Sequence, residues 1–489
     1  MNRHIVVLGG GLSGLSSAFH LSRRYPEALI TLVEKTHRLG GWISSERVQV
    51  RDGSGHTADI LLESGPRTLR PNAKSVLELV RTIKIHLLGL KTSIITTPVT
   101  SSATKNRYLQ IPETQGLITL PNTLTSVFSP PMRTMLLPHV LKEPVKRRNR
   151  PSGITDESVD SFMTRRFGPI FARTFGSALV HGIYAADSRQ LSVRAAFPSL
   201  WAMEDRGWGS VVRGALLPDT ASPRKDYDVG DIPDIMKNVS VYSFTDGIGT
   251  LTGALATRLQ NQPNVEILCD TPISSLGVAE NGLLEVHLAS GQKVNPTHIV
   301  SALPLPVLNN LLSPTSSLPH LTANPSSSVV VLNLIFPQTQ PRLHPAGFGY
   351  LIPRPPSGYT LDNPGILGTV FDSYAGNFTK MTVMMGGPNP ITPSHTDLDA
   401  VLKQLSVHLT APDDFLKVLP DPIYTRTHRH VDCIPTPTPG HLERMEELKV
   451  TLAKGVWSGR LEVIGAGVRG VSLGDCVESG KRVGENWIS

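Results

Sequence analysis

The sequence predicts an α/β protein in which one domain is assembled from segments at both ends of the chain. The first observation is a short apolar run at residues 5–8, followed by a glycine-rich turn and then by apolar residues at helical spacing. The second is a late apolar run at 461–464, which also leads into glycine and then into a helical stretch at 477–487. A buried strand, a glycine turn and a helix at each chain end are typical of a discontinuous nucleotide-binding fold.

The N-terminal glycine turn predicts a pyrophosphate-binding site. In this pattern Gly9 allows the tight turn, Gly11 lets backbone approach the phosphates, and Gly14 lets helix and strand pack closely. The helix N-terminus then faces the phosphates with free N–H groups. A second strand at 30–33 ends in Glu34, where an acid binds a ribose hydroxyl. The predicted contacts of this turn are Gly9, Gly10, Gly11, Leu12, Ser13 and Gly14.

The residues after Glu34 favour FAD over NAD. Arg38, Gly40, Gly41 and Trp42 form an R-x-G-G turn, and a second glycine turn follows at 62–66. This arrangement resembles the flavoprotein family of amine oxidases, phytoene desaturases and protoporphyrinogen oxidases, which implies one FAD per chain. The resemblance implies further cofactor contacts from Lys35, Gly65, Pro66, Arg67, Ile273, Ala466, Val471, Ser472 and Leu473. We expect little room for an N-terminal domain or cleavable presequence, because the fingerprint begins at residue 5.

Composition narrows the class of protein further. The chain has 489 residues, a hydrophobic content of 39% and a net charge of +7, as in a soluble globular protein of two or three domains. The longest apolar run, 329–336, is too short to span a bilayer. The positive charge is too diffuse to indicate nucleic-acid binding. The three cysteines, Cys269, Cys433 and Cys476, show neither metal-ligand spacing nor a flavinylation motif, so we expect no metal and a non-covalently bound FAD.

Breaks in composition predict three structural units. We expect a Rossmann-like FAD-binding domain, a substrate domain with a mixed sheet, and a mainly helical lobe. The FAD-binding domain is expected from residues 1–84, 244–310 and 431–489, the substrate domain from 206–243 and 311–430, with an exposed loop at 218–240, and the lobe from 85–205.

Several segments spread over nearly the whole chain resemble protoporphyrinogen oxidases more closely than other members of the family. They are residues 106–108, 182–188, 347–353, 382–387 and 470–480. The resemblance implies oxidation of protoporphyrinogen IX to protoporphyrin IX, the penultimate step of heme biosynthesis, with O₂ as oxidant and H₂O₂ as by-product. The flavin carries such chemistry, so we assign no general base.

A substrate that is an apolar macrocycle with two propionates needs an apolar cavity containing few charges. Arg107 is the predicted propionate clamp, because guanidinium pairs with carboxylate in a bidentate manner. Phe348, Leu351 and Met384 are the predicted apolar walls, and the matching motifs add Gly349 and Ala186.

The resemblance also implies a location and partners. The family acts at the mitochondrial inner membrane, and we expect peripheral attachment on its intermembrane-space side. The basic residues between Lys142 and Arg150 would meet anionic headgroups, and an aromatic stripe at 162–179 or the prolines before it would supply apolar contact. Further expected partners are ferrochelatase and a second copy of the chain.

Two alternatives remain open from sequence. One is another flavin oxidase or desaturase, acting on an amine or a polyene, although the aromatic residues that amine oxidases place near the C-terminus are missing at 468–470. The other is a non-catalytic binding protein on the same fold, like the GDP-dissociation inhibitors of small GTPases.

Overall fold

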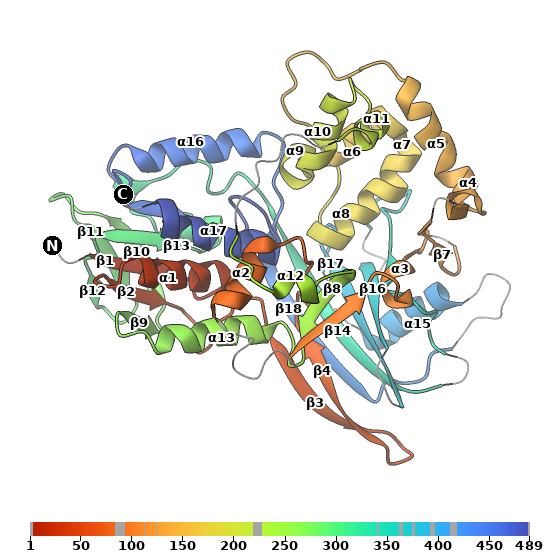
Figure 1. Cartoon of the computed structure of the whole chain (residues 1–489), viewed down its shortest axis with the longest axis horizontal. Helices are drawn as coiled ribbons and strands as arrows, with labels where there is room; N and C mark the ends of the chain where they lie inside the picture. The colour runs from red at the N-terminus through yellow and green to blue at the C-terminus, as the bar shows by residue number, and fades with distance from the viewer. Residues whose placement is uncertain are drawn as a thin grey trace.

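A computed structural model describes residues 3–487, except 84–92, 113, 124, 219–226, 340–341, 361–364, 374–376, 392–396 and 411–417. Figure 1 shows a parallel sheet with its helices on one side of the molecule and a larger mixed sheet on the other, with a helical lobe above the mixed sheet.

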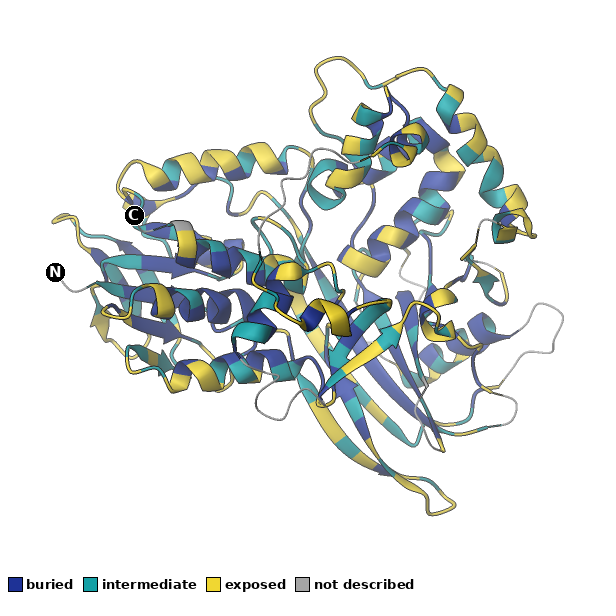
Figure 2. Ribbon diagram, in the orientation of Figure 1, coloured by how far each residue is buried: buried dark blue, intermediate teal, exposed yellow. Residues whose placement is uncertain are grey.

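The first sheet is the predicted nucleotide-binding sheet, and it is built from three distant parts of the chain. Its five parallel strands have the order β19-β13-β1-β2-β9. They span His4–Leu8 (β1), Leu29–Val33 (β2), Val265–Leu268 (β9), His298–Ser301 (β13) and Leu461–Val463 (β19). The central strands are buried on both faces, as their continuous apolar runs predict (Figure 2). The discontinuous domain is therefore confirmed.

The helices that cover this sheet bring the two chain ends together. They are α1 (Leu12–Arg24), α2 (Lys74–Thr82), α13 (Gly249–Gln260) and α17 (Leu473–Asn486). The hydroxyl of Ser16 on α1 donates to the carbonyl of Val477 on α17 at 3.0 Å. A Cβ on Gly480 would lie 2.6 Å from Ser16, so only glycine permits this close approach. The C-terminal helix begins four residues earlier than the sequence pattern indicates.

Smaller elements complete this side of the molecule. They are the hairpin β3 (Ser45–Arg51) and β4 (Thr57–Glu63), the sheet β10 (Ile273–Val278), β11 (Leu284–Leu288) and β12 (Lys293–Val294), and the helices α14 (Leu305–Leu311) and α16 (His441–Ala453).

The second sheet is the predicted mixed sheet, with the order β18-β14-β17-β16-β15-β6-β7. Its strands span Ser326–Pro337 (β14), Gly349–Leu351 (β15), Ile366–Ser373 (β16), Phe378–Gly386 (β17), Tyr424–Pro435 (β18), Tyr108–Leu109 (β6) and Ile118–Thr119 (β7). Helix α15 (Leu398–Leu409) packs on it. The last two strands come from a segment that the sequence assigned to the lobe, so the lobe starts later than residue 85.

The lobe is helical, and three aromatic side chains of its expected stripe are buried. Its elements are α3 (Ser102–Lys105) at its base, α4 (Met132–Met135), α5 (Leu137–Lys142), α6 (Val159–Phe167), α7 (Pro169–Phe171), α8 (Ser177–Tyr184), α9 (Val193–Ala196), α10 (Pro198–Arg206) and α11 (Val211–Leu216). The single helix expected at 162–179 is broken at Gly168, whose φ of 105° leaves the helical region. Phe162, Phe167 and Phe171 are buried together in the lobe core, so these three aromatic side chains are not available for membrane contact, whereas Ile170 and Leu179 of the same stretch are exposed.

The segment 218–240 is largely exposed in its described part, as expected, but it is not a loop throughout. Residues 219–226 lie outside the described residues, but the next segment forms α12 (Ile232–Ile235) and leads into β8 (Val239–Phe244). Strand β8 pairs with β5 (Ile94–Pro98). Ile232 and Met236 are buried in the same core as α1, so this segment packs on the nucleotide-binding domain. Within the described part of the chain, no helix is both long and apolar enough to cross a bilayer.

Candidate active site

The N-terminal turn has the geometry of a pyrophosphate cradle. Gly9 has a φ of 96°, and a Cβ on Gly14 would lie only 1.9 Å from the Gly9 carbonyl oxygen. Protein packing therefore demands glycine at both positions. Gly11 is different, because a Cβ there would meet no protein atom closer than the Gly41 Cα, at 3.9 Å. The space beside Gly11 is left open for a ligand.

The end of α1 beside this space has no cap from the protein. Gly11 is the N-cap and offers no side chain, and the first turn of the helix contains no acid. Leu12, Ser13 and Gly14 are nevertheless buried, and a buried helix N-terminus without partners needs a ligand to accept its N–H groups. A Cβ on Gly465, after β19, would also be at least 3.9 Å from any atom, the nearest being of Ala302 and Ser13. Turns from both chain ends thus border one open space that suits the phosphates of FAD.

Glu34 lies beside the turn, as predicted. Its Oε2 accepts a hydrogen bond from the Gly10 N–H at 2.8 Å, and its Oε1 accepts bonds from the N–H and the hydroxyl of Thr36. These bonds hold the carboxylate at the end of β2, where ribose hydroxyls bind in this type of fold. The neighbouring Lys35 is exposed.

Arg38 stabilises the second glycine turn through its own side chain. Its guanidinium donates to the carbonyls of Ile43 at 2.9 Å and Gly41 at 2.6 Å. Gly40 is bridged to Gly11, with its N–H bonded to the Gly10 carbonyl at 2.8 Å. Arg38 therefore acts on the shape of the cradle through backbone contacts.

Trp42 and Gly65 lie where this turn meets the second sheet. The indole of Trp42 is partly exposed and packs edge-on against His430 on β18, with ring centroids 5.1 Å apart. A Cβ on Gly65 would lie 3.1 Å from the Trp42 carbonyl oxygen, so glycine allows the two loops to touch. Pro66 is exposed.

The C-terminal segment reaches this site at the start of α17. Ser472 caps α17, and Asp475 completes a capping box by accepting hydrogen bonds from the N–H and hydroxyl of Ser472. Both bonds are accepted by Oδ2 of Asp475, so this oxygen stabilises the start of the helix. Val471 packs against the lobe core, while Ala466 and Leu473 flank the glycine turn. Ile273 begins β10, two residues after Thr271 donates to the Glu34 carbonyl.

Arg67, which the resemblance gave as a cofactor contact, reaches the substrate sheet. Its guanidinium forms an ion pair with Asp372 on β16 and lies 5.1 Å from the centre of the Phe348 ring. Asp372 also accepts a bond from the Thr382 hydroxyl at 3.1 Å and faces the Lys380 ammonium at 3.4 Å. Burial and, to a smaller extent, the positive charge of the nearby Arg67 lower the pKa of Lys380 to about 8. The pair joins the flavin-side loop to the mixed sheet.

Strand register brings the predicted apolar walls together. Leu351 on β15 pairs with Gly368 on β16, and Gly368 pairs with Met384 on β17, so all three share one face of the sheet. Leu351 and Met384 are partly buried. Helix α8 crosses close to this row, since a Cβ on Gly182 would lie 2.8 Å from Leu351.

Two predicted substrate residues have packing roles instead. A Cβ on Gly349 would lie 2.2 Å from the Thr369 carbonyl oxygen, so glycine is required there by the adjacent strand. The side chain of Ala186 is buried within the lobe core and offers a ligand no exposed surface. Sequence analysis missed Asp372, Thr382 and Lys380, since isolated polar residues in alternating strands give no local pattern.

Arg107 and Phe348 are neighbours, as the hypothesis of a carboxylate clamp at one edge of an apolar wall requires. The Arg107 guanidinium lies 6.0 Å from the centre of the Phe348 ring. Burial and then the nearby Arg70 lower the pKa of Arg107. No acidic partner of Arg107 is found among the residues that the structure describes, so its charge is available to an anionic ligand.

Comparison with known proteins agrees with this geometry. A family model described as flavin containing amine oxidoreductase matches residues 12–486. The chain therefore belongs to the family of flavin-containing amine oxidoreductases. The enzyme is an oxidoreductase with FAD as its cofactor, and the open cradle between the two chain ends fits that cofactor. A non-catalytic role on this fold is accordingly set aside.

Within that family, the similarity to curated relatives extends over the full chain. The sequence is 34% identical to the protoporphyrinogen oxidase of Schizosaccharomyces pombe, over 97% of this chain and 96% of that protein. It is 33% identical to the protoporphyrinogen oxidase of Homo sapiens, over 99% and 98%. A crystal structure from Exiguobacterium sp. 255-15 superposes with a TM-score of 0.73 at 21% identity, over 99% of this chain and 98% of that chain, which supports the fold.

Proposed function

We propose that the protein oxidises protoporphyrinogen IX to protoporphyrin IX, with O₂ as the electron acceptor. The observation that carries this proposal is the similarity, over nearly the full chain, to protoporphyrinogen oxidases of fission yeast and human. The alternative of an amine or polyene substrate has no comparable support, because solved structures of a putrescine oxidase and a cyclohexylamine oxidase with this fold are only 11% and 13% identical.

The protein's part in such a reaction is to hold an apolar ring with acidic substituents in one orientation. Bound FAD would supply the two-electron oxidation chemistry, which is needed three times per macrocycle and uses O₂ as the final acceptor, giving H₂O₂. Leu351, Met384 and Phe348 would contact the macrocycle, while Arg107 would bind a propionate. A fixed orientation converts a chance encounter into a reactive one.

The test is anaerobic mixing of the purified holoenzyme with protoporphyrinogen IX. We expect the flavin absorbance to bleach and to return when air is admitted, with porphyrin fluorescence appearing in step. Bleaching by an amine or a polyene, but not by the porphyrinogen, would instead identify the alternative activity.

We further propose that FAD is held without a covalent bond. All three cysteines are free thiols, and burial raises the pKa of Cys433 to about 11, which keeps it protonated and unreactive. Acid precipitation should leave the yellow colour in the supernatant. Colour that stays with the pellet contradicts the proposal.

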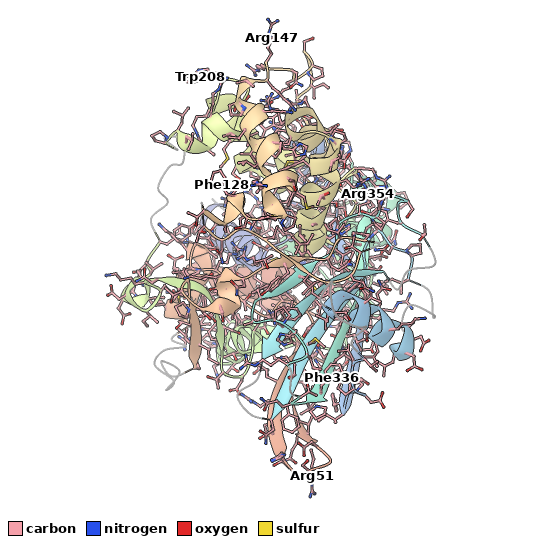
Figure 3. The ribbon with its side chains drawn as sticks, turned by 90° about the vertical axis from the view of Figure 1, so that its right-hand side faces the viewer. Arg51, Phe128, Arg147, Trp208, Phe336 and Arg354 are labelled. Carbon is pink, nitrogen blue, oxygen red and sulfur yellow. The ribbon has the colours of Figure 1, made fainter. Side chains whose placement is uncertain are left out.

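We propose that the tip of the helical lobe attaches the protein to the mitochondrial inner membrane, on its intermembrane-space side. Exposed apolar and basic side chains gather there, namely Val145, Arg147, Arg148 and Trp208. A Cβ on Gly209 would lie 2.6 Å from the Arg148 side chain, so the Trp208 loop and the basic segment are in contact. Figure 3 shows Arg147 and Trp208 at one end of the molecule, with Arg51 at the other.

Two members of the expected basic cluster serve the lobe instead, and a third, Arg148, makes a longer, exposed pair with Asp205 at 3.5 Å. Lys146 donates to the Arg166 carbonyl at 2.7 Å, and Arg150 is paired with Glu204 and Asp205. The variant for the membrane test should therefore keep Lys146 and Arg150 unchanged. The triple variant Arg147→Ser, Arg148→Ser, Trp208→Ser should lose binding to cardiolipin-containing vesicles, at about 1 kcal/mol per basic residue near the surface.

The matched control is Arg24→Ser with Arg51→Ser, which removes two exposed cations elsewhere. Unchanged co-sedimentation of the triple variant at low salt rules out the lobe tip as the membrane contact.

Two partners are proposed from the family resemblance, ferrochelatase as the acceptor of the product and a second copy of the chain. Light scattering and co-purification with ferrochelatase test them.

A further inference from the structure

Helix α8, at the base of the lobe, is bound to the backbone of the mixed sheet at two points one helical turn apart (Figure 1). The Nδ1 atom of His181 lies 2.7 Å from the Ile352 carbonyl oxygen, and the Arg354 N–H donates to the Ser177 hydroxyl at 2.8 Å. Residues four apart share one face of a helix, so both groups face the same stretch of chain. That stretch follows directly on β15, which ends at Leu351.

Both ring nitrogens of His181 are engaged. A carbonyl oxygen only accepts, so Nδ1 carries the proton and donates to Ile352. The Nε2 atom is then an acceptor, and the Tyr359 hydroxyl, 2.9 Å away, donates to it. The residue is only 5% exposed, and burial lowers its pKa to about 4, so the ring is neutral near pH 7. One neutral imidazole therefore links the end of β15 to a phenol seven residues further along the chain.

The same helix contacts the two strands that carry the predicted apolar wall. A Cβ on Gly182 would lie 2.8 Å from the Leu351 side chain. At the end of α8, a Cβ on Gly387 would lie 2.3 Å from the Ala185 carbonyl oxygen, and Gly387 is three residues beyond Met384. Close packing on both strands leaves little room for α8 to shift without moving Leu351.

The Arg354 side chain anchors the far end of the stretch that follows β15. Its guanidinium pairs with Asp160 on α6 at 2.8 Å and with Asp187, just after α8, at 3.5 Å. Arg354 is three residues beyond Leu351, whereas the carbonyl that His181 binds belongs to the next residue. Of these two anchors, His181 acts nearer to the wall.

We propose that His181 is a positioning residue that fixes the Leu351 side chain at the wall of the substrate site. It acts through the Ile352 carbonyl, while Gly182 leaves the leucine room beside α8. The inference rests on the proposed function, in which Leu351 contacts the macrocycle.

The test is a double-mutant cycle on binding of protoporphyrin IX to the FAD-loaded protein, measured by fluorescence titration. The variants are His181→Phe, which replaces the imidazole by a ring without hydrogen-bonding groups, Leu351→Ala, and the double variant. His408→Phe is the matched control. The His408 ring is also buried and also bonds a tyrosine hydroxyl, that of Tyr350 at 2.9 Å, on the opposite face of β15.

We expect His181→Phe to raise the dissociation constant about fivefold, as the loss of roughly one methylene contact predicts. In the Leu351→Ala background the same change should have no effect on binding, because the side chain that His181 positions is already removed. His408→Phe should bind like the wild type even where it lowers the melting temperature as much. His181→Gln, whose amide still donates to a carbonyl, should recover most of the affinity, and flavin content should be equal in all variants.

Three outcomes overturn the inference. An unchanged dissociation constant in His181→Phe shows that the histidine has no bearing on the site. Equal weakening in both backgrounds shows that it acts on binding without Leu351. Equal weakening by His408→Phe shows a general effect of losing a buried histidine.

If His181→Phe does not fold, Tyr359→Phe decides, because it removes only the hydroxyl that orients the imidazole. It should raise the dissociation constant by a smaller factor, and only where Leu351 is present. No rise, or a rise in both backgrounds, contradicts the inference. The cycle measures binding and needs no turnover, so its failure is distinct from failure of the anaerobic test with wild-type protein, which contradicts the proposed function itself.

Discussion

Arginines lie together in two regions of the molecule, the core of the helical lobe and the Phe348 ring with Arg67 and Arg107 beside it, and the two regions differ in how these charges are paired. In the lobe, Arg150, Arg165 and Arg166 face Glu143, Glu157 and Glu204 in a mostly buried network of matched charges. Of the two arginines beside Phe348, Arg67 alone has an acidic partner among the residues that the structure describes. A balanced buried network holds a fold together, while an exposed excess of one charge is what a ligand of the opposite charge requires.

The ion pairs of the lobe network are short. Arg165 reaches Glu204 and Glu157 at 2.5 Å each, and Arg166 reaches Glu143 at 2.5 Å. Glu143 also accepts hydrogen bonds from the N–H groups of Val211 and Val212, at the start of α11. The fully buried Glu143 carboxylate therefore both pairs with Arg166 and caps the start of α11.

The largest expected effect comes from breaking this network. Burial alone raises the pKa of Glu204, but hydrogen bonds from Arg165 and Arg150 hold it below the usual range. Glu204→Gln removes the buried acid that faces both Arg150 and Arg165 and leaves each with one other acidic partner. We expect a loss of about 3–5 kcal/mol in the free energy of unfolding. Denaturant titration measures it. The neighbouring Asp205→Asn, in a half-exposed pair, should cost less than about 1 kcal/mol, and equal effects of the two changes contradict the distinction between the regions.

The next effect concerns the cofactor rather than the fold. Glu34→Ala removes the carboxylate beside Gly10 and the contact predicted for the adenosine ribose. We expect a loss of about 2–4 kcal/mol in FAD affinity, seen as lower flavin content after dialysis. Glu280→Ala, at an exposed turn, serves as the control. Full retention of flavin by the Glu34 variant removes this acid from the cofactor site.

Arg107→Gln tests the second region, where an arginine is expected to bind a ligand and to contribute little to stability. Because its guanidinium balances no acid in the described structure, the change should leave the melting temperature close to that of the wild type. Binding of protoporphyrin IX should weaken by about 1.5–3 kcal/mol, as expected for a hydrogen bond to a charged group. Calorimetry and fluorescence titration on the same sample separate the two effects. A large fall in thermal stability makes Arg107 a structural residue like those of the lobe.

The smallest effect is expected at His181, where the lobe meets the mixed sheet. Its ring bonds the Ile352 carbonyl at 2.7 Å and the Tyr359 hydroxyl at 2.9 Å, and burial lowers its pKa to about 4. The unfolded chain, with a pKa near 6.5, binds the proton first as pH falls, so acidification favours unfolding. Between pH 6.5 and 5.5 this histidine should account for a loss of about 1 kcal/mol in unfolding free energy. His181→Gln should reduce the slope of stability against pH, whereas His37→Gln, at an exposed site, should not.

The basic segment at 142–150 shows why the lobe could not be understood from sequence. It resembles a membrane-binding patch, and half of it remains exposed. Arg150, however, also stacks on Trp201, with its guanidinium 3.8 Å from the ring centre, and pairs with an acid 54 residues away. Nothing local distinguishes Arg150 from Arg147, since only the packing of α10 against this segment decides which charge is buried.

The nucleotide-binding turn was predictable for the opposite reason. Gly9, Gly11, Gly14 and Glu34 act through backbone shape and short-range geometry, which adjacent residues in the sequence impose. Even the joining of the two chain ends could be predicted, because each end carries its own strand, glycine turn and helix. The sequence by itself therefore determined the FAD-binding fold and the class of enzyme.

The tertiary structure decided which charged side chains are matched. Arg67 and Arg107 look alike in sequence, but the register of β16 places Asp372 against Arg67, while Arg107 has no acid among the residues that the structure describes. Which strands become neighbours depends on the packing of the whole core, and an ion pair between distant residues leaves no periodic pattern in the chain. For that reason the positions of charge, and with them the substrate side of the site, became visible only in the folded molecule.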